Sequence, residues 1–471
     1  MDKKTFRENA HKAVDWVADY MENIEKFPVK SQVAPREIFD QIPDSPPNSE
    51  EEFDRFLEDL DEKIMPGITH WQHPNFHAYF PGNSSYPSIL GEIITSGIAA
   101  QCMIWETSPA AAELEEKMME WLKELMDLPA DWHGVIQDTA STATLAAILS
   151  AREKVSNQEI NKRGYQSRQL RVYCSSETHS SIDKAVKIAG IGSENLIKID
   201  VNDSLEMTPE NLKSAIQTDI ANGFTPCCVV ATLGTTSTLA FDPLDEISRI
   251  CEELGVWLHV DAAYAGSAFI LPEYRHLKRG LEKANSYVFN PHKWLMVNFD
   301  CSAYFVKDKT DLLNTFSILP EYLKTPTQGN VNNYRDWGIP LGRRFRALKL
   351  WFVLRSYGSE GLINLLRKHC ELGKWLETQI NDHPNFELVT PAAMNMVVFR
   401  WVQSDKTTDE LNKINSDILH TVNASGKAFL SHTKVHEKYA IRLVAGQTNV
   451  QQAHIQKVWK LINETVKKVK I

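Results

Sequence analysis

Two residues of this sequence are of types, and at a spacing, that can do chemistry together. Lys293 follows a strand-like apolar stretch and a histidine within residues 286–294, and Asp261 closes a second such stretch 32 positions earlier. A lysine amine can form a Schiff base with an aldehyde, and a carboxylate can pair with a protonated pyridine nitrogen. The pair therefore predicts a site for pyridoxal 5'-phosphate (PLP).

Each residue of this pair could instead have an ordinary structural role, which is more common for its residue type. Lys293 could be a solvated loop lysine, and Asp261 could cap the segment that follows it. However, Asp261 lies between an apolar run and the small residues at 262–267, Ala-Ala-Tyr-Ala-Gly-Ser. Its charge should therefore be buried and paired, and a pyridinium nitrogen is one such partner.

Three further strand-like stretches end in small polar groups. Residues 138–142, Asp-Thr-Ala-Ser-Thr, open a helix, where free backbone N–H groups and the positive end of the helix dipole can bind a phosphate. His179 follows a second stretch, and Gly-Thr-Thr at 234–236 follows a third. Singly, each is as readily an ordinary cap or core residue. Together they favour a ligand site at the carboxyl edge of a sheet.

From about residue 85 to residue 360, strand-like and helix-period segments alternate. This pattern predicts a largely parallel sheet with helices on both faces. The expected strands are 134–137, 171–174, 228–233, 257–261 and 286–290. A helix should begin at Ser108 and Pro109, with one apolar face formed by Leu114, Met118, Trp121, Leu122 and Leu125.

Two zones flank this region. Residues 1–84 are predicted to form helices joined by a Pro/Asp/Ser stretch; they cannot bury a core of their own and should pack on a partner subunit. Residues 366–471 are predicted to form a small α+β domain. The expected organisation is therefore an N-terminal helical segment (1–84), a large PLP-binding α/β domain (85–365) and a small C-terminal α+β domain (366–471).

Composition excludes several classes of function. The 471 residues are 43% hydrophobic and 24% charged, as in an average globular protein. The net charge of -10 argues against binding to nucleic acid or to an anionic membrane, both of which attract basic protein surfaces. Seven cysteines without C-x-x-C spacing argue against a disulfide framework or a structural metal. Since there is no apolar signal core and no apolar run of membrane length, we expect a cytoplasmic protein.

The sequence around the pair resembles a known family. The resemblance is carried by His-Val-Asp-Ala-Ala at 259–263, Asn-Pro-His-Lys-Trp at 290–294, Val-Asn-Phe-Asp-Cys at 297–301 and Pro-Leu-Gly-Arg-Arg-Phe-Arg at 340–346. These motifs are similar to those of the group II PLP-dependent decarboxylases, most closely the aromatic-L-amino-acid decarboxylases. The resemblance covers nearly the whole chain. It implies the type I, aspartate aminotransferase-like fold and an obligate homodimer with its active site between the subunits.

The resemblance also implies roles for individual residues. Lys293 would hold PLP as a Schiff base, Asp261 would keep the pyridine nitrogen protonated, and His179 would stack on the ring. The other expected cofactor contacts are Ala140, Ser141, Thr236, Ala263, Asn290 and His292. The family's phosphate turn usually begins with Gly-Ser, whereas this chain has Asp138 and Thr139. A carboxylate is therefore expected near the phosphate unless it points away.

A tyrosine on a closing loop is involved in protonating the substrate Cα in this family. Tyr334 matches it here, after the polar stretch 324–333. Related aldehyde synthases often carry phenylalanine at this tyrosine or asparagine at the stacking histidine. Because the chain keeps Tyr334 and His179, the resemblance favours amine release and predicts that Tyr334→Phe diverts turnover to aldehyde.

The expected substrate is an aromatic L-amino acid of the tyrosine, dopa, tryptophan and phenylalanine class. Aromatic walls stack on flat rings and disfavour a side-chain carboxylate. The resemblance places the substrate contacts at His179 and at Trp71, Tyr79, Phe80, Pro81, Gly82, Met103 and Gly342. Gly82 and Met103 replace larger residues of the animal enzymes, and Gly342 matches plant tryptophan decarboxylases. The alternatives are an aldehyde synthase, a glutamate or histidine decarboxylase, a silent scaffold, and a lysine enzyme without PLP.

Overall fold

The computed structural model describes residues 1–166, 169–318 and 329–469. The chain divides into two compact units, one made of Met1–Pro81 with His369–Ile471 and the other of Gly82–Lys368. The predicted closing loop, 324–333, falls partly outside the description, because residues 324–328 are not among the described ones.

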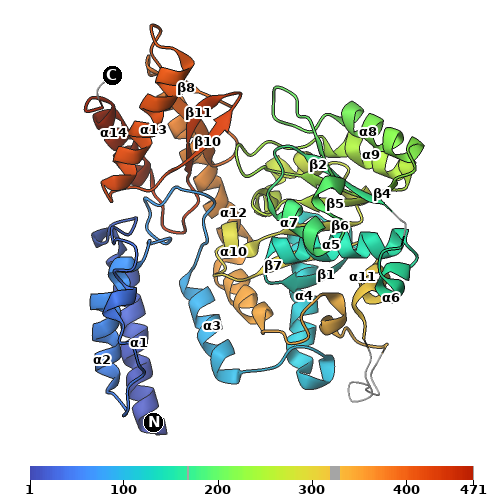
Figure 1. The fold of residues 1–471 in the computed structure, drawn as a ribbon. Coiled ribbons are helices and arrows are strands. Elements are labelled where there is room, and N and C mark those ends of the chain that lie inside the picture. The colour runs from blue at the N-terminus through green and yellow to red at the C-terminus, as the bar shows by residue number, and fades with distance from the viewer. Residues whose placement is uncertain (167–168, 319–328, 470–471) are drawn as a thin grey trace. The chain divides into compact units, whose positions relative to one another are not determined.

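A seven-stranded sheet forms the centre of the unit Gly82–Lys368 (Figure 1). Its strands are β1 His133–Gln137, β2 Leu170–Ser175, β3 Leu196–Ile199, β4 Thr225–Thr232, β5 Trp257–Asp261, β6 Ser286–Phe289 and β7 Ser302–Val306. They lie in the order β1-β7-β6-β5-β4-β2-β3, with β7 antiparallel to both its neighbours and the other pairs parallel. The predicted mostly parallel sheet is confirmed, whereas β3 and β7 were not predicted.

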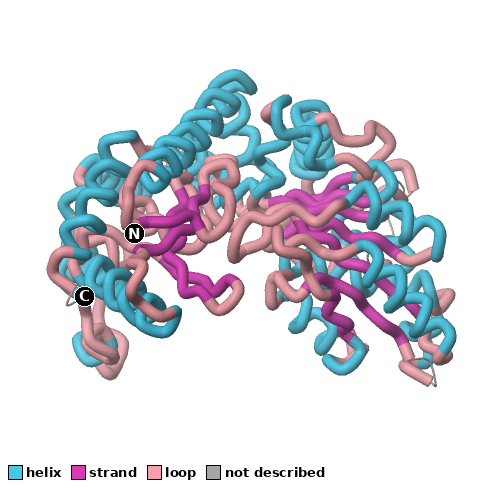
Figure 2. The backbone as a smooth tube through the Cα atoms, turned by 90° about the horizontal axis from the view of Figure 1, so that it is seen from above, coloured by secondary structure: helices cyan, strands magenta, loops and turns pink. Residues whose placement is uncertain are grey.

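Helices flank these strands (Figure 2). They are α3 Tyr86–Ile98, α4 Pro109–Met126, α5 Ala140–Val155, α6 Glu159–Arg163, α7 Ser181–Ile188, α8 Pro209–Ala221, α9 Leu244–Leu254, α10 Pro291–Trp294, α11 Lys309–Phe316 and the short 3-10 helix η11 Tyr334–Trp337. A long helix, α12 Arg346–Asn381, begins in this unit and breaks at Gly358, where φ is 64°. One cluster packs α5 and α7 on the sheet through Ile148, Ile182, Val172, Cys174 and Val230.

Burial explains which patterns were easy to predict. All five residues of β5 are buried and three of them are apolar, so the strand could be recognised from the sequence and its predicted bounds are correct. Ser108 and Pro109 begin α4 as expected. One member of the expected α4 face is wrong, because Trp121 is 40% exposed. The buried stripe of α4 includes Met119 and Met126 instead.

The other unit combines helices with a second sheet. Its helices are α1 Lys3–Glu22, α2 Phe53–Asp59, α13 Thr408–Ala424 and α14 Gln452–Val466. Its antiparallel strands are β8 Phe386–Leu388, β9 Met396–Trp401, β10 Ser431–Val435 and β11 Lys438–Val444, in the order β10-β11-β9-β8. Ile418 and Ile455 of its helices pack with Phe399 and Leu443 of its strands in one core.

Two kinds of feature, membrane-spanning helices and clusters of metal ligands, are absent from the described residues. None of their helices is both long and apolar enough to cross a membrane. Nor do they contain a group of three or more His, Cys, Asp or Glu side chains placed to hold a metal ion.

Candidate active site

Asp261 and Lys293 lie at or just after the carboxyl ends of two neighbouring strands of the sheet. Asp261 is the last residue of β5 and pairs in register with Val288 of β6. Its side chain is 5% exposed, and its Oδ1 accepts the backbone N–H of Ala263 at 2.9 Å. The two strand ends are joined again where Asn290 N donates to Ala263 O at 3.0 Å. Lys293 lies in α10, directly after this junction.

The charge of Asp261 affects the pKa of two other predicted groups, Lys293 and His179. Burial lowers the pKa of the Lys293 amine, and the charge of Asp261 opposes this shift. Burial also lowers the pKa of His179, which Asp261 raises and Lys293 lowers further. The three groups therefore share one electrostatic environment at the carboxyl edge of the sheet. A lowered lysine pKa increases the fraction of neutral amine, which is the form that attacks an aldehyde.

The ring of His179 is oriented by the start of α7. The backbone N–H of Ser181 donates to His179 Nδ1 at 3.1 Å, and Ser181 Oγ lies 2.9 Å from the same nitrogen. Because Nδ1 accepts a hydrogen bond, the proton of the neutral ring is assigned to Nε2. Part of His179 reaches solvent, while its ring lies deep enough for burial to lower its pKa, so the ring presents Nε2–H as a donor at the edge of the sheet.

The helix that follows β1 offers the predicted phosphate position. Thr139 is the N-cap of α5, and its side chain accepts the Thr142 N–H at 3.4 Å. Ala140 and Ser141 form the first turn, where backbone N–H groups have no acceptor within the helix. Ser141 is exposed and Ala140 is half-buried. The positive end of the α5 dipole therefore faces the carboxyl edge of the sheet.

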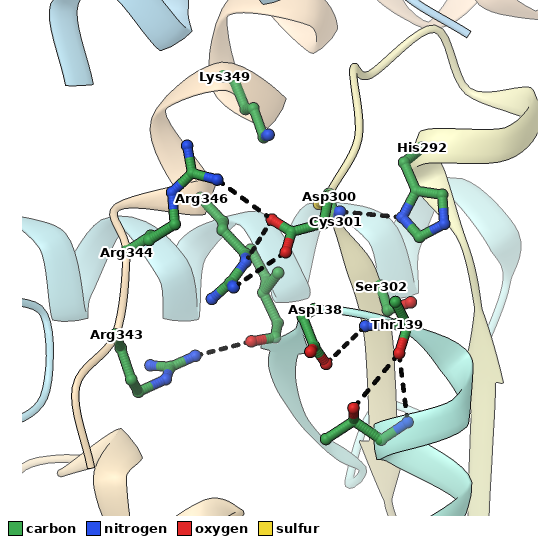
Figure 3. Close-up of polar contacts among 12 residues, drawn as sticks. Asp138, Thr139, His292, Asp300, Cys301, Ser302, Arg343, Arg344, Arg346 and Lys349 are labelled. Atoms are coloured by element: carbon green, nitrogen blue, oxygen red, sulfur yellow. Dashed lines mark hydrogen bonds and ion pairs between the residues drawn. The ribbon is translucent and has the colours of Figure 1, made fainter. Parts of the chain in front are cut away.

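Asn290 and His292 precede the lysine in the sequence and carry oriented polar atoms, and Figure 3 shows His292 next to the backbone of Cys301. Ser302 Oγ donates to Asn290 Oδ1, which fixes the orientation of the buried amide. Cys301 N donates to His292 Nδ1 at 2.9 Å, so the neutral ring carries its proton on Nε2. Burial, assisted by the charge of Lys293, lowers the pKa of His292 to about 3. His292 is thus a neutral donor at physiological pH.

Thr236 lies in the turn after β4. That turn is held by its neighbours: Thr235 Oγ1 accepts the Ala240 N–H at 3.1 Å and lies 3.2 Å from Thr238 Oγ1. Thr236 itself is half-buried, as is Ala263 in the turn after β5. Both expected ring contacts therefore follow carboxyl ends of strands that pair with one another.

A buried polar network beneath the site was missed from the sequence. His259 Nε2 lies 3.0 Å from Thr144 Oγ1, and His259 Nδ1 lies 2.9 Å from Ser286 Oγ, which also accepts Trp257 Nε1–H at 3.1 Å. Burial lowers the pKa of His259 to about 3, so the ring is neutral. The network links α5, β5 and β6, the elements that carry the phosphate turn, Asp261 and Lys293. The one available signal was the alternation that puts His259 and Asp261 on the same face of β5.

A second set of hydrogen bonds, which was not predicted from the sequence, fixes the loop after Lys293. Asn83 Nδ2 donates to Lys293 O at 2.8 Å, and Ser85 Oγ donates to Met296 O at 2.7 Å. Ser88 Oγ accepts the backbone N–H of Asn298 at 2.8 Å. In the sequence, only the run of small polar residues just before α3 could have indicated these contacts.

The position of Tyr334 does not fit the role expected for it. Its ring is 3% exposed and packs against Trp337, with ring centroids 5.3 Å apart. It belongs to a hydrophobic cluster with residues of α5, β6 and β7. After burial, the charges that most affect its pKa are those of Glu115, Glu116 and Arg343. A tyrosine held in this packing is not on an exposed loop, so we correct the expectation and do not assign proton donation to it.

The predicted substrate contacts are distributed over both units. In the first unit, Trp71 and Tyr79 stack with ring centroids 6.0 Å apart and are 41% and 51% exposed. Phe80, which is 8% exposed, lies under the guanidinium of Arg442. Pro81 is buried as well.

The remaining predicted contacts belong to the second unit. Met103 O accepts the backbone N–H of Arg335 at 2.9 Å, so the segment before α4 is tied to η11. Gly342 is exposed, and a Cβ added there would lie 3.3 Å from Gln101 Nε2. Gly82 is half-buried.

A model of the "Pyridoxal-dependent decarboxylase conserved domain" matches residues 35–402. The chain belongs to this decarboxylase family. Tyrosine decarboxylase 2 of Narcissus pseudonarcissus is 44% identical over 98% of this chain and 94% of its own. Phenylacetaldehyde synthase of Arabidopsis thaliana is 44% identical over 98% of this chain and 96% of its own. The crystal structure of Oryza sativa TDC with PLP and tryptamine matches with a TM-score of 0.97 at 34% identity, covering 99% of both chains.

The decarboxylase uses pyridoxal phosphate, and its residues suit that group. Asp261 is a buried carboxylate of the kind that pairs with a pyridinium, and the Lys293 amine has a lowered pKa. The first turn of α5 provides open N–H donors for a phosphate. The type I PLP fold predicted from the sequence is likewise confirmed.

Proposed function

We propose that this decarboxylase converts aromatic L-amino acids into the corresponding arylalkylamines and carbon dioxide. The observation that carries the proposal is the shared electrostatic environment of Lys293, Asp261 and His179. The names of similar proteins, a tyrosine decarboxylase and a TDC crystallised with tryptamine, support an aromatic substrate. The stacked, exposed rings of Trp71 and Tyr79 are suited to contact a flat side chain.

Each residue contributes a separate task in this proposal. Bound pyridoxal phosphate supplies an electron-accepting ring that takes up the electron pair left on Cα when carbon dioxide departs. Lys293 would hold the cofactor through its amine. Asp261 keeps a proton on the pyridine nitrogen, and the N–H groups of Ala140 and Ser141 bind the phosphate. His179 presents its Nε2–H to the ring and the substrate.

A product assay tests the proposal. Tyrosine, dopa, tryptophan, phenylalanine, glutamate and histidine are offered separately, and amine, carbon dioxide, aldehyde and peroxide are measured together. We expect amine and carbon dioxide from at least one aromatic amino acid and neither from glutamate. Turnover of glutamate or histidine alone would contradict the aromatic substrate. A protein that shows no absorbance change with added PLP would contradict the proposed site.

An aldehyde synthase is the second candidate, because phenylacetaldehyde synthase is as similar to this chain as the tyrosine decarboxylase. The retained His179 favours amine release. Tyr334 no longer supports amine release, because its ring is buried. Equal amounts of aldehyde and peroxide in the product assay would identify the synthase.

The Tyr334→Phe variant is expected to release the same product as the wild-type enzyme. The ring packs in a hydrophobic cluster, so the variant loses one buried hydroxyl and keeps the packing. Amine, aldehyde and peroxide from the variant should therefore match the wild type in their ratios. One other tyrosine, Tyr322, lies between α11 and Tyr334, outside the described residues, and Tyr322→Phe is the comparison variant. If Tyr334→Phe formed aldehyde and Tyr322→Phe did not, Tyr334 would take part in protonating the substrate Cα after all.

We further propose that the enzyme is a homodimer and that residues 1–84 pack on the partner subunit. The support for the dimer comes from α3, directly after that segment, which carries a one-sided apolar face of exposed side chains: Tyr86, Leu90, Ile93, Ile94 and Ile98, each 43% to 56% exposed. Their spacing puts them on one helix face. An exposed apolar patch of this kind is typical of an interface. A second copy of the chain would cover it.

The double variant Leu90→Asp/Ile94→Asp is expected to convert the dimer into a monomer. Two carboxylates in the centre of the face would lose their hydration when a partner covers them. Sedimentation velocity measures the change. Ser96→Asp, an exposed residue on another side of α3, is the matched control and should stay dimeric. A double variant that sediments as a dimer would contradict the role of α3.

We also infer a cytoplasmic location. None of the seven cysteines, all of which lie in the described part of the chain, forms a disulfide, and six of them are buried. A reducing compartment preserves such thiols.

A further inference from the structure

The residue before the N-cap of α5 is an aspartate. Asp138 follows β1 and is half-buried, and its Oδ1 accepts the backbone N–H of Thr139 at 2.7 Å. Figure 3 shows its carboxylate next to the backbone at the start of α5. A carboxylate at a helix N-terminus is stabilised by the helix dipole. Asp138 therefore occupies part of the positive field that the first turn of α5 offers to a phosphate.

Arg346, a cation that senses the charge of this carboxylate, is already paired with another residue. Arg346 donates from Nε to Asp300 Oδ1 at 2.9 Å and from Nη2 to Asp300 Oδ2 at 3.2 Å. Although burial opposes it, the hydrogen bonds and charge of Asp300 raise the pKa of Arg346, and Asp138 adds a smaller effect. Among the described residues, no Lys, Arg or His forms an ion pair with Asp138. Its negative charge is therefore not neutralised locally.

We propose that Asp138 sets the affinity for the cofactor, by weakening phosphate binding at the first turn of α5. This rests on the proposed phosphate position at Ala140 and Ser141. A carboxylate and a phosphate in the same small, partly buried region repel each other. The same carboxylate stabilises α5 when no phosphate is bound, because it serves the helix N-terminus as a built-in anion. The cofactor-free protein is thus stabilised and the cofactor exchanges more readily.

Asp138→Asn separates the charge from the hydrogen bond. The asparagine Oδ1 still accepts the Thr139 N–H, so the geometry of the turn is kept while the negative charge is lost. We expect the variant to bind PLP about tenfold more tightly than the wild type. Repulsion between two neighbouring negative charges in a partly buried site is large enough to weaken binding by about this factor or more. The difference should shrink at about 1 M salt, where the Debye length is about 3 Å. The cofactor-free variant should also unfold at a slightly lower temperature.

Equilibrium titration of the cofactor-free enzyme, followed by absorbance, measures these affinities. Pyridoxal, which lacks the phosphate, should bind the wild type and Asp138→Asn equally. Asp131→Asn removes an exposed carboxylate at the other end of β1 and should leave PLP affinity unchanged. Asp138→Gly, which loses both charge and acceptor, should also bind PLP more tightly than the wild type.

Two outcomes would overturn the inference. One is equal PLP affinity of the wild type and both Asp138 variants. The other is an equal gain for pyridoxal and PLP, which would show that the phosphate is not involved. If instead no protein bound PLP, the proposed site itself would be wrong. Failure of the inference and failure of the site are therefore distinguishable.

Discussion

Lys293→Ala is expected to lower kcat by about a thousand-fold or more, as is found when a residue that forms the covalent intermediate is removed. The lysine is the amine whose lowered pKa, caused by burial, favours attack on the cofactor aldehyde. The variant should also lack the visible absorbance that arises when a lysine amine joins PLP. Spectra and amine production are measured on the same preparation.

Lys307→Ala is the control for this experiment, because Lys307 is an exposed lysine that follows β7 in the same unit. It should keep both the absorbance and the activity. If Lys293→Ala retained the lysine-type absorbance, another lysine would hold the cofactor and the assignment would be wrong.

The Asp261→Asn variant should lose about a hundred-fold or more in kcat, because each unit lost from the pyridine pKa is worth about 1.4 kcal/mol. Its asparagine would keep Oδ1 as acceptor for Ala263 N–H, so the turn after β5 should survive. The second oxygen, however, becomes an amide that cannot hold a proton on the pyridine nitrogen. The loss should therefore appear in kcat, with PLP still bound.

Asp203→Asn, a change at an exposed carboxylate, controls for the loss of one charge. It should keep wild-type kcat. An Asp261→Asn variant with wild-type kcat would contradict the role of Asp261, whereas one that failed to bind PLP would point to a structural role.

The residues at and after the carboxyl ends of β5 and β6 could be predicted, because strands buried on both faces give largely apolar stretches in the sequence. The polar residues after such runs must lie at one edge of the sheet. This is why Asp261 and Lys293 were found before the fold was known. The family motifs added the type I fold and the expected roles of the individual residues.

Other features depend on contacts between distant segments. The strand β7 pairs antiparallel with both β1 and β6, and nothing in its own five residues indicates those partners. Tyr334 follows a polar stretch, which suggested an exposed loop, yet tertiary packing buries its ring against α5 and the sheet. The pairing of His259 with Thr144 joins residues 115 positions apart. Such contacts leave no local pattern in a single sequence.

The loop after Lys293 is held largely through its main chain. Asn83 and Ser85 donate to the carbonyl oxygens of Lys293 and Met296, and Ser88 accepts the backbone N–H of Asn298. Backbone atoms are the same for every amino acid, so these three contacts do not specify which side chains the loop carries. These three contacts would therefore survive substitution of the loop's own side chains, provided that Asn83, Ser85 and Ser88 are kept; the burial of Met296 and its neighbours, rather than these hydrogen bonds, restricts which side chains fit there.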